Sequence, residues 1–248
     1  MILKQGISYG KQNLQKHLSL HHELVQRMMD NLHYMKIQPQ VILDWGCYDG
    51  FSTQGLKRYF SKAHVIAVEQ NPMLCQLAKK KSRWLKPFLV IDATAEAFPL
   101  AHESVDMIFA HQVFYPMPQL QTWLTECFRV LKPEGCLIFS TFGPDTFKEF
   151  SSVRPWNFSD LHDIGDELLR QGFLDPVMSR QDLKMRYAQK EVLKEALAQW
   201  NIFPASIEES YLTYELVFAQ AWRASQKPQS SQEQTISLAS IRKKLSNN

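Results

Sequence analysis

The sequence contains no apolar run that approaches the roughly 20 residues of a membrane-spanning helix. Its beginning, MILKQGISYGKQNLQKHL, is polar and has no apolar segment of the kind found in secretory signals. We therefore expect a soluble protein of the cytoplasm.

Cysteine is scarce as well, with four residues in 248. The four lie in apolar segments, and their spacing matches no zinc module. We expect reduced residues that fill the core, and we expect no bound metal. They are Cys47, Cys75, Cys127 and Cys136.

A strong charge of either sign is also missing, because the formal net charge is only +3. Nucleic-acid-binding surfaces need clustered lysine and arginine. The basic clusters here are short: KKKSRWLK at residues 79–86 and IRKKL near the C-terminus. The composition does not favour a nucleic-acid partner.

The length and the apolar content of 45% suit one sizeable core and hardly two independent domains. We expect a single domain over residues 1–222, with an N-terminal helical cap at 1–38. A lid or substrate region at 142–200 is expected before the last strands. The polar segment from Ser225, SQKPQSSQEQ, predicts a flexible tail over 223–248.

Apolar runs of β-strand composition alternate with helical patterns along the chain. This alternation predicts a mostly parallel sheet with crossover helices. A late segment, SYLTYELVFAQAW, is long enough to be a central strand. The expected strands before it are Val41–Trp45, His64–Glu69, Pro87–Asp92, Val105–Ala110 and Cys136–Thr141.

Three helices have readable ends. Asn71 followed by Pro72 is typical of a helix start, with asparagine as the cap and proline in the first turn. A second helical pattern covers residues 119–131 and stops at KPEG. The third, SDLHDIGDELLRQGF, is expected to be capped at its start and to end at Gly172.

The stretch VILDWGCYDGFSTQGL, residues 41–56, has the form of a strand, a glycine turn and a helix. In an open parallel sheet, ligands bind beyond the carboxyl ends of the strands where the strand order reverses, and the first such turn lies there. Gly46 and Gly50 permit positive φ angles, but Tyr48 stands where a third small residue is expected. A left-handed backbone would strain Tyr48 by about 1 to 3 kcal/mol, whereas an extended one would project its ring over the site.

Acidic residues stand at the ends of three successive expected strands: Asp44, Glu69 and Asp92. A carboxylate at the position of Glu69 can accept hydrogen bonds from both hydroxyls of a ribose. Asp92 and the following Ala93 are placed to meet an adenine edge. The spacing therefore favours a site for an adenine nucleoside.

The turn sequence G-C-Y-D-G argues against a dinucleotide. A pyrophosphate site wants G-x-G-x-x-G and a bare helix terminus, whereas Asp49 would repel phosphate. S-adenosylmethionine has no phosphate and carries a sulfonium cation, so acids at the strand ends suit it better.

Longer stretches carry a family resemblance. From VILDWGCYDG through VIAVEQNPMLCQLAKK, IDATAEAFPLAHESVDMIFA and ECFRVLKPEGCLIFSTF, the sequence resembles the class I methyltransferases. Three later segments, FGPDTFKEF, FSDLHDIGDELLRQGFLDPVM and YLTYELVFAQAW, look like the malonyl-ACP O-methyltransferase family of biotin synthesis. The resemblance implies an α/β, Rossmann-like fold: a mostly parallel seven-stranded sheet with helices on both faces and a small helical lid.

The resemblance also implies a reaction. S-adenosylmethionine would be the cofactor, and the free carboxylate of a malonyl group on acyl carrier protein would be methylated, so that fatty-acid elongation can build a pimeloyl chain. The carrier protein would be acidic, and a modest basic patch is expected near the pocket mouth. The implied cofactor-binding residues are Asp44, Gly46, Cys47, Tyr48, Gly50, Glu69, Gln70, Asp92, Ala93 and His111.

A malonyl carboxylate is already ionised at pH 7, so its attack on a sulfonium methyl group needs no general base. Catalysis would rest on positioning and water exclusion, on the order of 7 to 11 kcal/mol in favourable cases. Each candidate for orienting the carboxylate also has a structural interpretation, such as a helix cap, a solvated helix face or loop packing. The candidates are His111, Tyr115, Lys148, Arg154 and His162.

Three functions remain open from the sequence. The first is methylation of malonyl-ACP. The second is methylation of another small acid, since the segment HQVFYPMP departs from the family pattern and the chain looks shortened before its last strand. The third is a non-catalytic homologue with impaired cofactor binding, because of Tyr48. A nucleic-acid methyltransferase is disfavoured, since no DPPY-like or NPPF-like tetrapeptide occurs.

Overall fold

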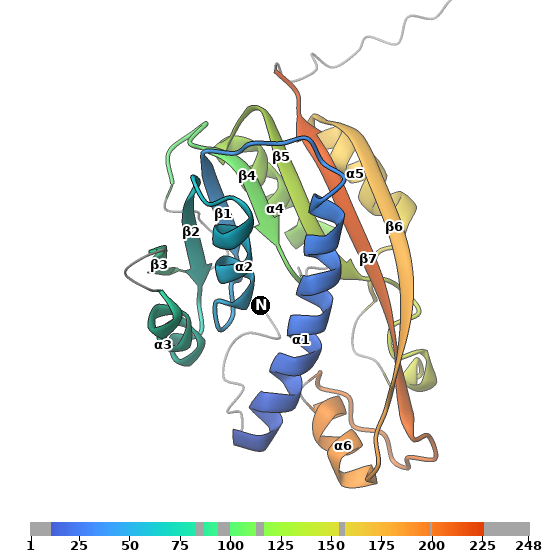
Figure 1. Cartoon of the computed structure of the whole chain (residues 1–248). Helices are drawn as coiled ribbons and strands as arrows, with labels where there is room; N and C mark the ends of the chain where they lie inside the picture. The colour runs from blue at the N-terminus through green and yellow to red at the C-terminus, as the bar shows by residue number, and fades with distance from the viewer. Residues whose placement is uncertain are drawn as a thin grey trace, which may run out of the picture.

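A computed structural model describes residues 11–82, 87–93, 100–112, 117–153, 157–198 and 200–225. Within this part of the chain lies one seven-stranded sheet of order β3-β2-β1-β4-β5-β7-β6 (Figure 1). Strands β1 to β5 are mutually parallel, and β7 is antiparallel to both of its neighbours. The strands are β1 Val41–Trp45, β2 His64–Glu69, β3 Leu89–Asp92, β4 Val105–Ala110, β5 Leu131–Phe142, β6 Phe173–Arg186 and β7 Tyr211–Arg223.

Helices cover both faces of this sheet. In Figure 1, α1 lies in front of the strands with α2 and α3 beside it, while α4 and α5 lie behind. The predicted fold, a mostly parallel Rossmann-like sheet between helices, is confirmed. The helices are α1 Lys11–Leu32, α2 Phe51–Tyr59, α3 Pro72–Lys81, α4 Met117–Val130, α5 Leu161–Gln171 and α6 Lys190–Ala198, with a 3-10 helix, η1, at Lys148–Phe150.

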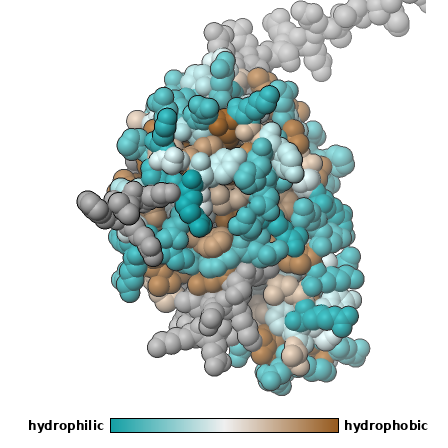
Figure 2. Space-filling view, in the orientation of Figure 1, coloured by the Kyte–Doolittle hydropathy of each residue, from teal (hydrophilic) through white to brown (hydrophobic). Residues whose placement is uncertain are grey.

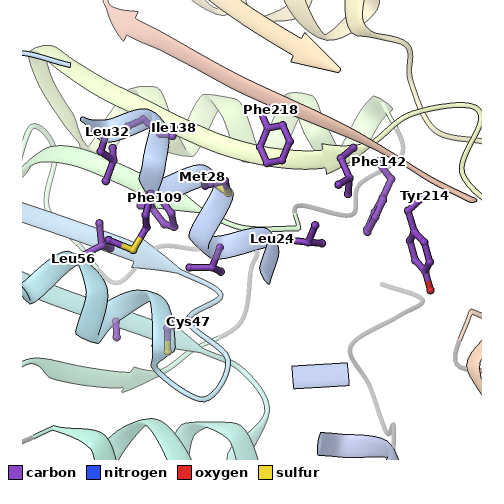
Figure 3. Close-up of a cluster of buried hydrophobic side chains, with 14 of the residues drawn as sticks. Leu24, Met28, Leu32, Cys47, Leu56, Phe109, Ile138, Phe142, Tyr214 and Phe218 are labelled. Atoms are coloured by element: carbon purple, nitrogen blue, oxygen red, sulfur yellow. The ribbon is translucent and has the colours of Figure 1, made fainter. Parts of the chain in front are cut away.

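Two hydrophobic cores follow from the alternation of side chains along the strands. One lies on the α1 face, where Met28 sits between Phe109 and Phe218 (Figure 3). The other lies on the α4 face, where Trp123 of α4 packs edge-on against Phe139 of β5. Because both faces are buried, the central strands are mostly apolar, as parallel strands usually are, and their acidic residues are exceptions.

The predicted helix ends are confirmed where they were readable. The Asn71 side chain accepts hydrogen bonds from the N–H groups of Met73 and Leu74, and Pro72 is the first residue of α3. At α5, the cap is Asp160, and Gly172 ends the helix with a φ of 98°. The four cysteines are free and buried, as expected.

The strand order reverses between β1 and β4. From β1 the chain proceeds outward to β2 and β3, and then crosses back to β4 and β5 on the other side of β1. The carboxyl ends of β1 and β4 therefore form the topological switch point, where ligands of such sheets bind. The register pairs Trp45 with Ala110, so these two strand ends lie level.

The region before the last strand contains a strand that the sequence did not reveal. The range 142–200, predicted as a lid, contains β6, which is a full edge strand paired with β7 along most of its length. The sequence of β6 does not have the pattern of a buried strand, because Pro176 interrupts the segment and most of its side chains are exposed. An edge strand needs only one partner, so proline is tolerated at such a position.

The face that carries α1 shows mostly hydrophilic side chains with smaller hydrophobic areas between them (Figure 2). In the described part of the chain, no helix has the length and apolar character that a membrane crossing requires. Of the tail predicted over 223–248, Arg223 is the last residue of β7, and residues 226–248 lie outside the described residues. α1 falls within the range 1–38 for which a helical cap was predicted.

Candidate functional site

The turn between β1 and α2 has a left-handed backbone at every second residue. The φ angles are 73° at Gly46, 50° at Tyr48 and 80° at Gly50. Glycine adopts this conformation without cost, whereas tyrosine is strained by about 1 to 3 kcal/mol. At Gly50 a side chain would also crowd α3, since a Cβ there would lie 3.1 Å from Ala78. Of the two alternatives raised for Tyr48, the structure shows the strained one.

The Tyr48 side chain spans the switch point. Its hydroxyl donates to Oε1 of Gln112, just beyond β4, at 3.2 Å. The ring packs against the imidazole of His21 on α1, with centroids 4.1 Å apart, and it is buried. The tyrosine thus connects the end of β1 with the end of β4 and with the helix that covers them.

Glu69, at the end of β2, holds the backbone around the turn. One carboxylate oxygen accepts the N–H of Tyr48 at 3.0 Å, and the other accepts the N–H of Asn71 at 2.8 Å. A carboxylate has about four acceptor positions, so two further donors can be accommodated. Asp92 is paired with Glu69 across the sheet, and its side chain is exposed.

Asp44, near the end of β1, binds two side chains at the start of α2. It is buried, and its Oδ2 accepts hydrogen bonds from Ser52 at 2.7 Å and from Thr53 at 2.5 Å. Burial raises the pKa of this carboxyl group to about 7, although the two hydroxyl donors work against the rise. Its contacts make Asp44 an anchor for the first turn of α2.

Asp49 is the meeting point of three helices. Its carboxylate lies 3.0 Å from Nε2 of His22 on α1 and 2.5 Å from Nζ of Lys81 on α3, and it accepts the N–H of Phe51 on α2 at 3.2 Å. Burial opposes its ionisation, but the hydrogen bonds from His22 and Lys81 outweigh burial and hold the pKa of Asp49 below its ordinary value.

His111 follows β4 directly and is buried beside α1. Its Nδ1 lies 2.7 Å from the hydroxyl of Ser140 on β5 and 3.3 Å from the sulfur of Met28. The same hydroxyl accepts the N–H of Gln112 at 3.0 Å. The ring centroids of His111 and His21 are 4.8 Å apart. Polar side chains therefore form a cluster where the ends of β4 and β5 meet α1.

The remaining predicted cofactor residues lie along the same edge. Cys47 is buried in the turn, its N–H donates to the carbonyl of Val68 at 3.0 Å, and burial raises the pKa of its thiol. Gln70 and Ala93 are half-buried just after β2 and β3.

The substrate-orienting candidates are not all in one place. His111 is at the switch point, whereas Lys148 in η1 is half-exposed and lies 3.8 Å from Asp145. His162 is exposed in the first turn of α5, which packs on α4 and β6 behind the sheet. Tyr115 and Arg154 lie outside the described residues.

Sequence reasoning missed four residues of this site: His21, His22, Lys81 and Gln112. The pair of adjacent histidines in α1 was the available signal, but nothing in the sequence places α1 against the turn. Among the described residues, no group of three or more His, Cys, Asp or Glu side chains is arranged to hold a metal ion.

Comparison with known proteins gives the family. Residues 43–139 match the family model described as "Methyltransferase domain". A malonyl-ACP O-methyltransferase of Legionella pneumophila is 30% identical over 241 residues, covering 83% of this chain and 84% of that protein. The chain belongs to the malonyl-ACP O-methyltransferase family. The enzyme of that name from Halorhodospira halophila is 31% identical and covers 85% of this chain and 83% of its own length.

Solved structures support the fold of this methyltransferase family member. The YcgJ protein from Bacillus subtilis superposes with a TM-score of 0.63 at 14% identity, covering 82% of this chain and 99% of that one. Phosphoethanolamine N-methyltransferase 2 of Haemonchus contortus, solved with S-adenosyl-L-methionine, gives a TM-score of 0.57 at 18% identity, covering 82% and 52%. At these identities the likeness concerns the fold alone. The predicted family is confirmed by the curated relatives.

Proposed function

We propose that this chain transfers a methyl group from S-adenosylmethionine to the free carboxylate of a malonyl group on acyl carrier protein. The relationship to the two malonyl-ACP O-methyltransferases carries the proposal, because it extends over more than four fifths of the chain. It therefore includes the segments after β5, which a methyltransferase fold by itself does not specify.

The residues at the switch point fit this cofactor. Glu69 retains acceptor positions for ribose hydroxyls, and Asp92 presents an exposed carboxylate at the neighbouring strand end. A sulfonium cation is favoured near such acids, whereas a pyrophosphate would be repelled by them. Asp49, which from the sequence alone was expected to repel phosphate, faces His22 and Lys81, and the ammonium group of Lys81 offsets its charge.

S-adenosylmethionine, when bound, supplies an activated methyl group that a carboxylate oxygen can accept without any proton transfer. The chain then has to orient the carboxylate and exclude water. His111 is the described candidate best placed to do so, because it lies at the end of β4 and is held by Ser140. Lys148 and His162 are exposed and lie on other elements, so we do not assign them to the carboxylate.

A carrier protein partner would be acidic, and the end of α3 offers positive charge near the crevice. Lys79 and Lys80 are exposed there, whereas Lys81 is engaged with Asp49. We assign the first two lysines to the basic patch that the family resemblance led us to expect.

The direct test measures transfer of a labelled methyl group from S-adenosylmethionine to malonyl-ACP. Transfer by the wild-type protein and its loss in Glu69→Ala are expected. The acetyl-loaded carrier, which lacks the free carboxylate, is the matched negative substrate. Absence of transfer to malonyl-ACP together with transfer to another small acid would contradict the substrate and favour the second function raised from the sequence.

A second candidate function, a non-catalytic homologue with impaired cofactor binding, is favoured by one observation: the Tyr48 ring is buried across the crevice. Calorimetric titration with S-adenosylhomocysteine separates the two. Tight binding by the wild-type protein excludes a blocked pocket, whereas absence of binding by the wild type supports the second candidate.

A further inference from the structure

We infer that Tyr48 is the gate of the cofactor pocket and sets how easily an adenosyl ligand enters, with His21 on α1 as the residue that holds the gate shut. The inference rests on the proposed function, since it assumes that the ligand of the crevice is S-adenosylmethionine or its product. It assigns a role to the residue by which this chain departs from the glycine pattern of its turn.

The backbone of Tyr48 is fixed, so only its side chain can move easily. Its N–H is bound by Glu69, and it stands between Gly46 and Gly50 in a turn of three left-handed residues. From this fixed point the ring reaches across to Gln112 beyond β4. It therefore crosses the switch point, where a ligand of this fold has to lie.

His21 of α1 makes the third contact of Tyr48, after those with Glu69 and Gln112. Its imidazole is fully buried and lies 4.1 Å from the tyrosine ring and 4.8 Å from that of His111. The next residue, His22, binds Asp49 and stacks on Phe51 with centroids 4.0 Å apart. Two successive residues of α1 thus contact two successive residues of the turn: His21 packs on Tyr48, and His22 binds Asp49. These contacts hold the tyrosine ring in the crevice.

An entering ligand has to compete with these contacts. Swinging the ring away breaks at least its hydrogen bond to Gln112, which joins neutral groups, and its contact with the ring of His21. Contacts of these two kinds together correspond to a closed state favoured by about 10- to 100-fold. The apparent affinity for an adenosyl ligand is reduced by the same factor, because only the open fraction binds.

The test follows the association of S-adenosylhomocysteine by stopped flow, in the wild type and in variants of the two residues. Tyr48→Phe removes only the hydroxyl and is expected to bind about 3- to 10-fold faster. Tyr48→Gly removes the ring and suits the left-handed backbone, and about 10- to 100-fold faster and tighter binding is expected. His21→Ala is expected to accelerate association without altering the turn itself.

Tyr187→Phe serves as the control. Its hydroxyl contacts that of Tyr214 at 3.3 Å, far along the chain from the turn, so the same chemical change leaves the gate intact. Association at the wild-type rate is expected for this variant.

The outcomes separate the gate from the proposed function. Binding by the wild type with equal rates in all variants, or weaker binding by Tyr48→Gly, overturns the gate and leaves the methyltransferase proposal standing. If Tyr48→Gly binds and the wild type does not, the tyrosine ring blocks the pocket of the wild type. This result supports the gate and contradicts turnover by the natural chain. Absence of binding in both contradicts the gate together with the cofactor assignment.

Discussion

The Nζ atom of Lys81 lies 2.5 Å from Oδ2 of Asp49, so the last turn of α3 is fastened to the loop that follows β1. The same carboxylate reaches His22 of α1 and the backbone of α2. From the sequence alone, Asp49 was expected to repel a phosphate group. In the fold it also positions three helices around the crevice.

Asp49→Ala is expected to destabilise the protein by about 2 to 3 kcal/mol, because Lys81 and the N–H of Phe51 lose a buried acceptor. Unfolding in urea measures the change. Asp145→Ala is the matched control, since this carboxylate is 43% exposed and its ion pair with Arg180 lies at the surface. A change within about 0.5 kcal/mol is expected there, and equal losses in the two variants would contradict the role of Asp49.

Asp44 predicts a dependence of stability on pH. Its folded pKa of about 7 lies above the ordinary value of 3.8, so the folded state holds the proton more tightly. The resulting stabilisation is fully present below pH 3.8 and is lost as the pH rises through 7. From pH 5 to pH 8, Asp44 should lower the free energy of unfolding by about 2 to 3 kcal/mol.

Asp44→Asn tests this directly, because the amide oxygen can still accept from Ser52 or Thr53 but cannot titrate. Urea unfolding of both proteins from pH 5 to pH 8 should give a flatter curve for the variant. Parallel curves would show that Asp44 ionises normally in the folded state.

Gly143 allows Glu215 of β7 to approach the start of the loop after β5. A Cβ at this position would lie 2.3 Å from the carboxyl carbon of Glu215, which is buried and accepts the N–H of Asp145. Gly143→Ala is therefore expected to cost about 2 kcal/mol in the free energy of unfolding.

Gly165→Ala is the control for that loss, because its Cβ would meet only the sulfur of Met178 at 3.4 Å. Within α5 the exchange should be neutral or stabilising by up to about 1 kcal/mol. Thermal unfolding of both variants gives the comparison, and a loss at Gly165 as large as at Gly143 would argue against crowding as the cause.

Much of the sheet was predictable from local pattern. The spans of β1, β2 and β4 agree with the expected strands because their apolar runs are bounded by turn residues on both sides. β6 was missed because an exposed edge strand lacks the buried run that identifies the others. Its pairing with β7 joins residues that lie between 25 positions (Arg186 and Tyr211) and 50 positions (Phe173 and Arg223) apart, beyond any local pattern.

The site was predictable only in its strand-end acids. Glu69 and Asp92 stand at the expected edge, and the sequence did not reveal that Ser52 and Thr53 of the following helix bind Asp44. The contact between Tyr48 and His21 joins residues 27 positions apart on elements whose packing no periodicity specifies. The strain at Tyr48, in contrast, follows from tyrosine occupying a glycine position.

Calorimetric titration with S-adenosylhomocysteine tests the central assignment most directly, in the wild type, Glu69→Ala and Glu69→Gln. The wild type is expected to bind with one site per chain, Glu69→Ala to show no binding, and Glu69→Gln to bind at least 10-fold more weakly, since it keeps an acceptor for the turn but loses the charge. Binding by Glu69→Ala as tight as that of the wild type would contradict the account.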